Sequence, residues 1–226
     1  MKIGVLHCGH VPEVIADTHG DFRAMFARLL DGHGFSLESY DVCDMEFPAG
    51  PELADGWLIT GSLHGAYEDV PFIAPLEDLI RSIHVAKRPM VGICFGHQII
   101  AQALGGRVEK FSGGWSVGRT EYRFDGHGDL ALNAWHQDQV VERPEGARVV
   151  ASSDFCENAA LAYGDSILTV QPHPELDPFI LGDFLRAKRD TVPVPADMMD
   201  AAEAALDQPT DEPVLARMIA GHFRGA

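Results

Sequence analysis

Residues 89–98 have the sequence Pro89-Met90-Val91-Gly92-Ile93-Cys94-Phe95-Gly96-His97-Gln98, and this stretch decides the fold. An apolar run typical of a strand meets a cysteine between two glycines, and a helical run over residues 99–104 follows at once. This layout predicts a nucleophile elbow, in which a strand turns directly into a helix. The turn brings the residues two before and two after the cysteine close together, so glycine at 92 and 96 removes side chains that would collide.

The cysteine of this elbow is a candidate nucleophile. Cys94 is expected to project from the turn, exposed and strained, over the first turn of the helix. Unpaired N–H groups and the positive end of the helix dipole favour a thiolate there. The N–H of Phe95 would face an oxyanion formed above the sulfur. The alternative is a buried, inert cysteine, as most free cysteines are, and the two glycines with their flanking strand and helix argue against it.

A second stretch supplies a base for this nucleophile. Residues 166–171 predict a strand, which delivers Pro172-His173-Pro174-Glu175 at its carboxyl end, the edge where open parallel sheets bind ligands. On an extended segment, residues two apart point the same way, so Glu175 can accept a hydrogen bond from one imidazole nitrogen of His173 while the other faces Cys94. Alone, this motif would rather predict a surface turn. Together with the elbow it predicts a catalytic pair.

The two stretches together resemble a known family. Gly92-Ile93-Cys94-Phe95-Gly96-His97-Gln98 and Gln171-Pro172-His173-Pro174-Glu175 are similar to class I glutamine amidotransferases, and most closely to the glutaminase domain of GMP synthase and its stand-alone relatives. The resemblance covers about residues 1–190. It implies that Gly61, in the segment Trp57-Leu58-Ile59-Thr60-Gly61-Ser62, supplies the second oxyanion N–H beside Phe95. It also implies that Gln98 contacts the bound substrate.

A further segment that resembles the family differs from the family pattern at one position. Trp135-His136-Gln137-Asp138 occupies the place where members of the synthase type carry a Ser-His-x-Asp segment. The resemblance makes His136 a candidate substrate-binding residue. Trp135 replaces the serine, which changes the surroundings of the α-amino and carboxylate ends of the substrate.

The order of apolar patterns predicts an α/β fold, an open, mostly parallel sheet with helices on both faces. The resemblance implies the same class, a flavodoxin-like sheet with antiparallel strands attached. Those strands are expected around residues 119–124, 131–135 and 148–152. We assign residues 1–190 to one amidotransferase domain. Residues 191–226 are expected to form a helical extension, with helices near 196–206 and 214–223, packed on that domain.

Composition excludes several function classes. The chain has 226 residues, of which 46% are hydrophobic, enough to bury a full core. Its formal net charge of −17 would repel phosphate backbones and anionic lipids, so neither nucleic acid nor a membrane surface is an expected partner. The first residues contain too short an apolar run for a secretion signal, and no segment has the length of a membrane span. A cytoplasmic location is expected.

No cofactor and no metal are predicted. The four cysteines lie far apart and show no paired spacing, which excludes a disulfide framework. His7-Cys8-Gly9-His10 holds three possible metal ligands, but no second cluster of ligands completes a tetrahedral site in the sequence. A loop at the edge of the sheet is the favoured interpretation.

These residues predict hydrolysis of a γ-glutamyl amide, L-glutamine to glutamate and ammonia, through a Cys94-His173-Glu175 triad and a γ-glutamyl thioester. The chain contains no phosphate-binding Gly-x-x-x-x-Gly-Lys loop, so a separate ATP-dependent synthetase subunit is the partner that would use the ammonia. A stand-alone γ-glutamyl hydrolase or peptidase is the alternative, and Trp135 in place of the family's serine favours it. A non-catalytic regulatory binder is a third and less favoured interpretation.

Overall fold

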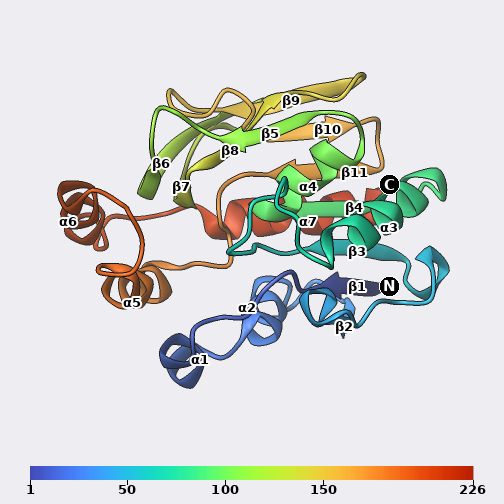
Figure 1. The fold of residues 1–226 in the computed structure, drawn as a ribbon, viewed down its shortest axis with the longest axis horizontal. Coiled ribbons are helices and arrows are strands. Elements are labelled where there is room, and N and C mark those ends of the chain that lie inside the picture. Colours follow the sequence, from blue (N-terminus) through green and yellow to red (C-terminus); the bar gives the residue numbers. More distant parts are fainter. Residues whose placement is uncertain (226) are drawn as a thin grey trace.

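The computed structural model describes residues 1–225, which are arranged around one large sheet (Figure 1). Its strand order is β2-β1-β3-β4-β11-β10-β9-β6-β7. The first five strands are parallel, namely β2 (Ser36–Tyr40), β1 (Lys2–Leu6), β3 (Gly56–Ile59), β4 (Met90–Ile93) and β11 (Ile167–Val170). The α/β class with a mostly parallel sheet is therefore confirmed.

Antiparallel strands extend the sheet beyond β11. They are β10 (Ala160–Tyr163), β9 (Ala147–Ser152), β6 (Ser116–Phe124) and β7 (Gly128–His136). Three of them lie where the sequence predicts attached hairpins. A separate two-stranded sheet pairs β5 (Arg107–Lys110) with β8 (Asp138–Glu142), which the sequence does not predict.

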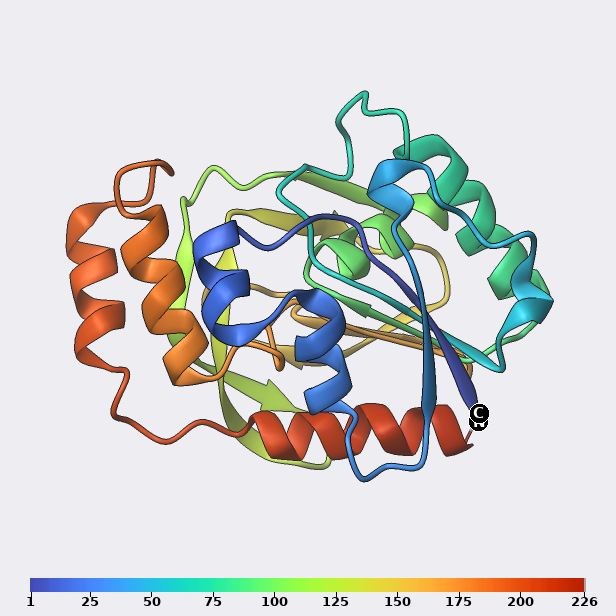
Figure 2. The same cartoon turned by 90° about the horizontal axis from the view of Figure 1, so that it is seen from below.

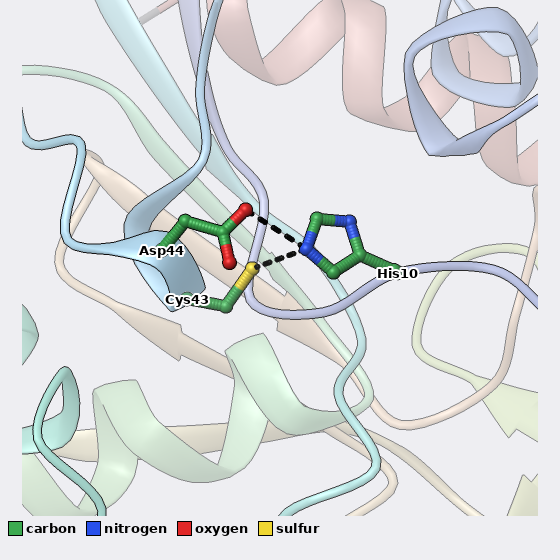
Figure 3. A group of neighbouring side chains, drawn as sticks. All are labelled: His10, Cys43 and Asp44. Carbon is green, nitrogen blue, oxygen red and sulfur yellow. Dashed lines mark hydrogen bonds and ion pairs between the residues drawn. The ribbon is translucent and has the colours of Figure 1, made fainter.

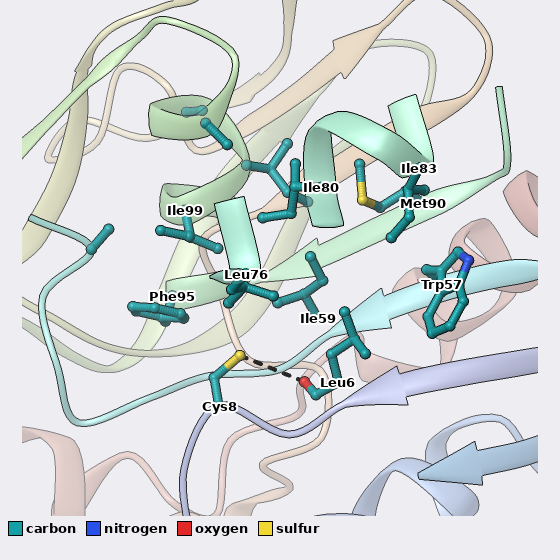
Figure 4. Close-up of a cluster of buried hydrophobic side chains, with 14 of the residues drawn as sticks. Leu6, Cys8, Trp57, Ile59, Leu76, Ile80, Ile83, Met90, Phe95 and Ile99 are labelled. Atoms are coloured by element: carbon teal, nitrogen blue, oxygen red, sulfur yellow. Dashed lines mark hydrogen bonds between the residues drawn. The ribbon is translucent and has the colours of Figure 1, made fainter. Parts of the chain in front are cut away.

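Alternating side chains on the central strands divide the core into two layers. Trp57 and Ile59 of β3 face one side, where α3 (Ile73–Val85) and α4 (Phe95–Ala103) cover the sheet (Figure 4). Leu58 faces the other side, where it meets α2 (Phe22–Leu29) and α7 (Glu212–Gly225). Each layer excludes water from one face of the parallel strands.

A group of shorter helices lies at one end of the sheet, away from the N-terminus (Figures 1 and 2). It comprises α1 (Glu13–His19), α5 (Pro178–Lys188) and α6 (Ala196–Ala204). The patterns in the sequence do not predict α1 or α5. Asp177 caps α5 by accepting a hydrogen bond from the N–H of Ile180 at 2.8 Å, and Pro178 occupies its first turn.

The C-terminal segment packs on the rest of the chain. Leu215, Ile219 and Phe223 of α7 are buried in the same cluster as residues of β1, β3 and β4, and Met199 of α6 packs with Leu185 of α5. The domain boundary near residue 190 stays a prediction, and Ala226, which belongs to the predicted extension, lies outside the described residues. None of the helices within residues 1–225 is both long and apolar enough to cross a membrane.

Candidate active site

The predicted elbow is present between β4 and α4. Cys94 has φ 54° and ψ −105°, a backbone conformation that residues with a side chain rarely adopt. A Cβ atom at Gly92 would lie 2.4 Å from the carbonyl oxygen of Gly96, and one at Gly96 would lie 2.2 Å from the carbonyl oxygen of Ile59. Both glycines are therefore required by close backbone contacts, as the motif predicts.

The side chain of Cys94 differs from the prediction in its exposure. It is only 7% exposed, because it lies at the floor of a pocket rather than on an open turn. The pocket is lined by the cysteine and by Gly9, Pro12, Leu63 and Trp135. These wall residues come from segments far from the elbow in sequence, so the local motif gives no sign that they cover the sulfur.

His173 and Glu175 lie at the same pocket, on the segment that follows β11. The Nδ1 atom of His173 lies 2.7 Å from Oε1 of Glu175, and both residues are buried. The backbone N–H of His173 donates to the carbonyl oxygen of Asn133 at 2.9 Å, which fixes the imidazole against β7. The segment turns at Pro174 and Glu175 instead of running extended, yet the predicted pairing forms.

The charge state of His173 follows from its neighbours. Burial by itself lowers the pKa of this imidazole, but the negative charges of Cys94 and Glu175 outweigh that effect and raise the pKa well above 6.5. Nε2 of His173 is buried and has no hydrogen-bond partner among residues 1–225. The ring is therefore anchored at Nδ1 by Glu175, while the Cys94 side chain is close enough to raise its pKa.

The two candidate oxyanion donors also lie beside Cys94. Phe95 is the first residue of α4, so no residue of the helix accepts its N–H. Gly61 lines the pocket, and a Cβ atom there would lie 3.4 Å from Cε1 of His173 and 4.0 Å from Cβ of Cys94. The loop after β3 thus brings a side-chain-free backbone close to the sulfur and the imidazole.

The side chains of the two candidate substrate contacts are hydrogen-bonded within the protein. Gln98 is buried, and its amide nitrogen donates to the carbonyl oxygen of Asp138 at 2.9 Å and to Oε1 of Gln171 at 3.0 Å. His136 is buried as well, with Nδ1 3.2 Å from the carbonyl oxygen of Asp138. Neither side chain is among the described residues that line the Cys94 pocket.

Two buried histidines beneath the pocket are held uncharged. Nδ1 of His97 lies 2.8 Å from the hydroxyl oxygen of Thr169. Burial, together with the proximity of the His136 imidazole, lowers the pKa of His97 to about 3. Burial likewise lowers the pKa of His136 to about 4. Both rings are therefore neutral in the folded protein.

Sequence reasoning missed the apolar side of the pocket. Phe184 of α5 and Phe22 of α2 line it, and the rings of Trp135 and Phe184 lie 6.2 Å apart between centroids. Trp135, noted in the sequence only as a departure from the family pattern, forms part of this wall. Its apolar neighbour comes from a helix that the sequence patterns do not predict, so no signal in the sequence could have paired the two.

Comparison with known proteins finds a matching family model and related sequences. The family model described as glutamine amidotransferase class-I matches residues 16–185. Gamma-glutamyl peptidase 4 of Arabidopsis thaliana is 32% identical over 188 residues, covering 76% of this chain and 75% of the relative. One of the subunits of the glutamine-hydrolyzing GMP synthase of Halobacterium salinarum is 32% identical over 173 residues, covering 72% of this chain and 88% of the relative.

The fold is shared with solved structures. The crystal structure of a glutamine amido transferase from Methylobacillus flagellatus covers 99% of this chain with a TM-score of 0.78, and 94% of that protein is covered in return. The two sequences are 18% identical, so this likeness concerns the fold alone. The family match and the relatives above show that the chain belongs to the class I glutamine amidotransferase family.

Proposed function

We propose that this protein hydrolyses γ-glutamyl amides, with Cys94 as nucleophile, His173 as acid and base, and Glu175 as the group that orients His173. One observation carries the proposal. Glu175 holds Nδ1 of His173 at 2.7 Å, while the free Nε2 lies in the same buried pocket as the strained Cys94. A nucleophile, a base and an orienting carboxylate in this order form the general arrangement of covalent amide hydrolysis.

The groups support the following sequence of steps. The Cys94 thiolate attacks the γ-carbonyl carbon, and the carbonyl oxygen gains a negative charge that the N–H groups of Phe95 and Gly61 stabilise, each by roughly 3 kcal/mol. The C–N bond then breaks as the His173 imidazolium protonates the leaving nitrogen. A γ-glutamyl thioester remains on Cys94. Water, deprotonated by His173, attacks the thioester and releases the γ-carboxylate and the thiolate.

The surroundings of Cys94 favour a γ-glutamyl amide that is larger than glutamine. The Cys94 pocket shares Gly9, His10 and Phe22 with a neighbouring hollow of about 220 Å³, which gives an extended leaving group a place to lie. Trp135 presents an apolar wall where the family pattern has a serine. The similarity to γ-glutamyl peptidase 4 supports the same interpretation. Of the two candidate functions, we therefore favour a stand-alone γ-glutamyl hydrolase.

A glutaminase that feeds a separate ATP-dependent synthetase is the second candidate. The similarity to the GMP synthase relative, of which 88% is covered, favours it. Such a protein would hydrolyse L-glutamine and release ammonia to its partner. The two candidates use the same residues at Cys94 and differ only in the leaving group.

Product release from a substrate panel tests both candidates. Purified protein is given L-glutamine and γ-glutamyl dipeptides, and glutamate and amine release are measured for the wild type, Cys94→Ala and a thiol control, Cys156→Ala. We expect turnover of the dipeptides that Cys94→Ala abolishes and Cys156→Ala retains. Weak activity confined to glutamine would favour the synthetase-linked glutaminase. A folded Cys94→Ala variant with full turnover would overturn the mechanism, and a folded wild type without any turnover would point to a binding protein.

A further inference from the structure

Three potential metal ligands, His10, Cys43 and Asp44, converge in the structure (Figure 3). One of them, His10, lines the Cys94 pocket. The Nε2 atom of His10 lies 2.9 Å from Oδ2 of Asp44 and 3.6 Å from Sγ of Cys43. All three ligand atoms lie within 4.8 Å of one another. The sequence does not reveal the group, because Cys43 and Asp44 follow His10 by 33 and 34 residues. Only the pairing of two strands brings them together.

The backbone holds these residues in place before any ligand binds. His10 follows β1, while Cys43 and Asp44 belong to the 3-10 helix η1 (Val42–Asp44), which follows the neighbouring parallel strand β2. The N–H of Cys43 donates to the carbonyl oxygen of His7 at 3.2 Å, and the N–H of Asp44 donates to the carbonyl oxygen of Asp41 at 2.9 Å. The thiol and the carboxylate are therefore presented from a short, internally bonded turn.

The donor set suits one class of ion. Imidazole nitrogen, thiolate sulfur and carboxylate oxygen are the ligands of tetrahedral zinc, and sites with three protein ligands keep a fourth position for water. Zinc bonds of about 2.0 to 2.3 Å require ligand atoms about 3.3 to 3.8 Å apart. The His10 to Cys43 distance already fits this range, and the His10 to Asp44 distance has to open by less than about 1 Å. The side chains of His10 and Asp44 are 64% and 55% exposed, so water can reach the fourth position.

We propose that His10, Cys43 and Asp44 bind a divalent transition-metal ion of the zinc class at the rim of the Cys94 pocket. Coordination replaces the Sγ–H proton of Cys43, which passes to the buffer, and a metal–sulfur bond forms in its place. His10 lines both the Cys94 pocket and the neighbouring hollow. Bound metal therefore ties the loop over residues 9–12, one wall of the pocket, to the turn after β2.

The test measures metal binding and needs no turnover. Because Cys94 and His173 could themselves hold zinc, reduced Cys94→Ala protein is titrated with Zn²⁺ in competition with a chromophoric chelator. Cys43→Ser and His10→Gln are made in the same background. The matched control is His64→Gln, because Nδ1 of His64 also lies 2.9 Å from a carboxylate, that of Glu68, and both side chains are similarly exposed, but no thiol completes that pair.

The expected result is one equivalent of Zn²⁺ per chain, with affinity reduced more than about tenfold by Cys43→Ser and by His10→Gln and unchanged by His64→Gln. Co²⁺ should give a near-ultraviolet thiolate band that Cys43→Ser removes. Cys8 and Cys156 are buried, so they do not compete for the ion. Zn²⁺ should also slow hydrogen exchange at the backbone N–H groups of residues 9–11. Binding that survives both substitutions, or no binding by folded protein at millimolar Zn²⁺, would overturn the proposal.

Discussion

Glu175 contacts His173 from only two residues along the chain, with Oε1 2.7 Å from Nδ1, and neither residue belongs to a helix or strand. The pair is held by the turn itself and by the bond from the His173 N–H to Asn133 on β7. Because the carboxylate is buried, its charge acts on the imidazole with little screening by water.

Glu175→Gln is therefore expected to lower kcat/KM for a γ-glutamyl amide by about 10³ to 10⁴, since a neutral amide does not stabilise the imidazolium. The pKa of His173 should fall with the loss of this charge, which a pH profile of the residual activity would detect. Glu157→Gln, at an exposed carboxylate, serves as the control and should retain activity. If Glu175→Gln lowered kcat/KM by less than tenfold, Glu175 would not belong to the proposed catalytic triad.

The strain at Cys94 can be measured by comparing two inactive variants. Cys94→Gly and Cys94→Ala both remove the sulfur, but glycine adopts φ 54° and ψ −105° without a steric penalty. We expect Cys94→Gly to be more stable than Cys94→Ala by about 1 kcal/mol or more in urea unfolding. Equal stability, or a more stable alanine variant, would show that the elbow stores no strain.

Gly96→Ala should destabilise the fold, because the new methyl group would meet the carbonyl oxygen of Ile59, a backbone atom that cannot move aside. The expected loss is about 1 to 3 kcal/mol. Gly221→Ala on α7 is the matched control, since a Cβ atom there meets nothing within 4 Å. It should gain up to about 1 kcal/mol from helix propensity. Similar free energies of unfolding for the two variants would contradict the predicted collision.

The free energy of unfolding is expected to decrease as the pH falls, because two histidines are buried in their neutral form. His97 and His136, whose pKa values are lowered to about 3 and about 4, stay neutral in the folded protein, whereas the unfolded chain takes up their protons near pH 6.5. Between pH 6.5 and about 4 the unfolded state therefore binds more protons, and each ring costs about 1.4 kcal/mol of stability per pH unit. His173 acts in the opposite sense, because a raised pKa stabilises the fold at low pH.

Urea unfolding of His97→Gln across this range checks the prediction. The slope of stability against pH should flatten by about 1.4 kcal/mol per unit relative to the wild type. His84→Gln, which alters an exposed ring, should leave the slope unchanged. If the slope of His97→Gln matched that of the wild type, His97 would not be the neutral ring described above.

The C-terminal helix should be essential to the core. Phe223 is 1% exposed and packs edge-on against Phe35 at 5.7 Å between ring centroids. Phe223→Ala is expected to cost about 3 to 5 kcal/mol, and Arg217→Ala on the exposed side of the same helix should cost less than about 0.5 kcal/mol. A single unfolding transition in the wild type would support our assignment of this extension to the same folded unit. Two separate transitions would contradict it.

Most of the fold follows from short-range patterns. The elbow, the strand β11 and the helices α6 and α7 have apolar patterns or glycines that backbone contacts require, so the sequence predicts them within a few residues. The helices α1 and α5 are not predicted, because their apolar side chains pack against each other and against residues of α2, α6 and β7 that are distant in sequence. Only tertiary packing determines them.

The site divides in the same way. Cys94 and His173 belong to local motifs, and the sequence predicts both. The depth of Cys94, the wall formed by Trp135 and Phe184, and the meeting of His10 with Cys43 depend on contacts between distant segments. Residue spacing carries no information about such contacts. The substrate contact of Gln98 stays a prediction, and its amide nitrogen donates to Asp138 and Gln171 within the protein.

The order of the parallel strands has a consequence for how this scaffold can diverge. Gly61, Cys94 and His173 follow β3, β4 and β11, which are immediate neighbours in the sheet. The loop over residues 9–12 and the turn after β2 follow the two strands on the sheet's outer side. Substitutions in those outer loops can alter this part of the pocket wall without disturbing the register of the three inner strands. The proposed catalytic groups and this part of the wall therefore lie on separate parts of one sheet, and each can change while the other is preserved.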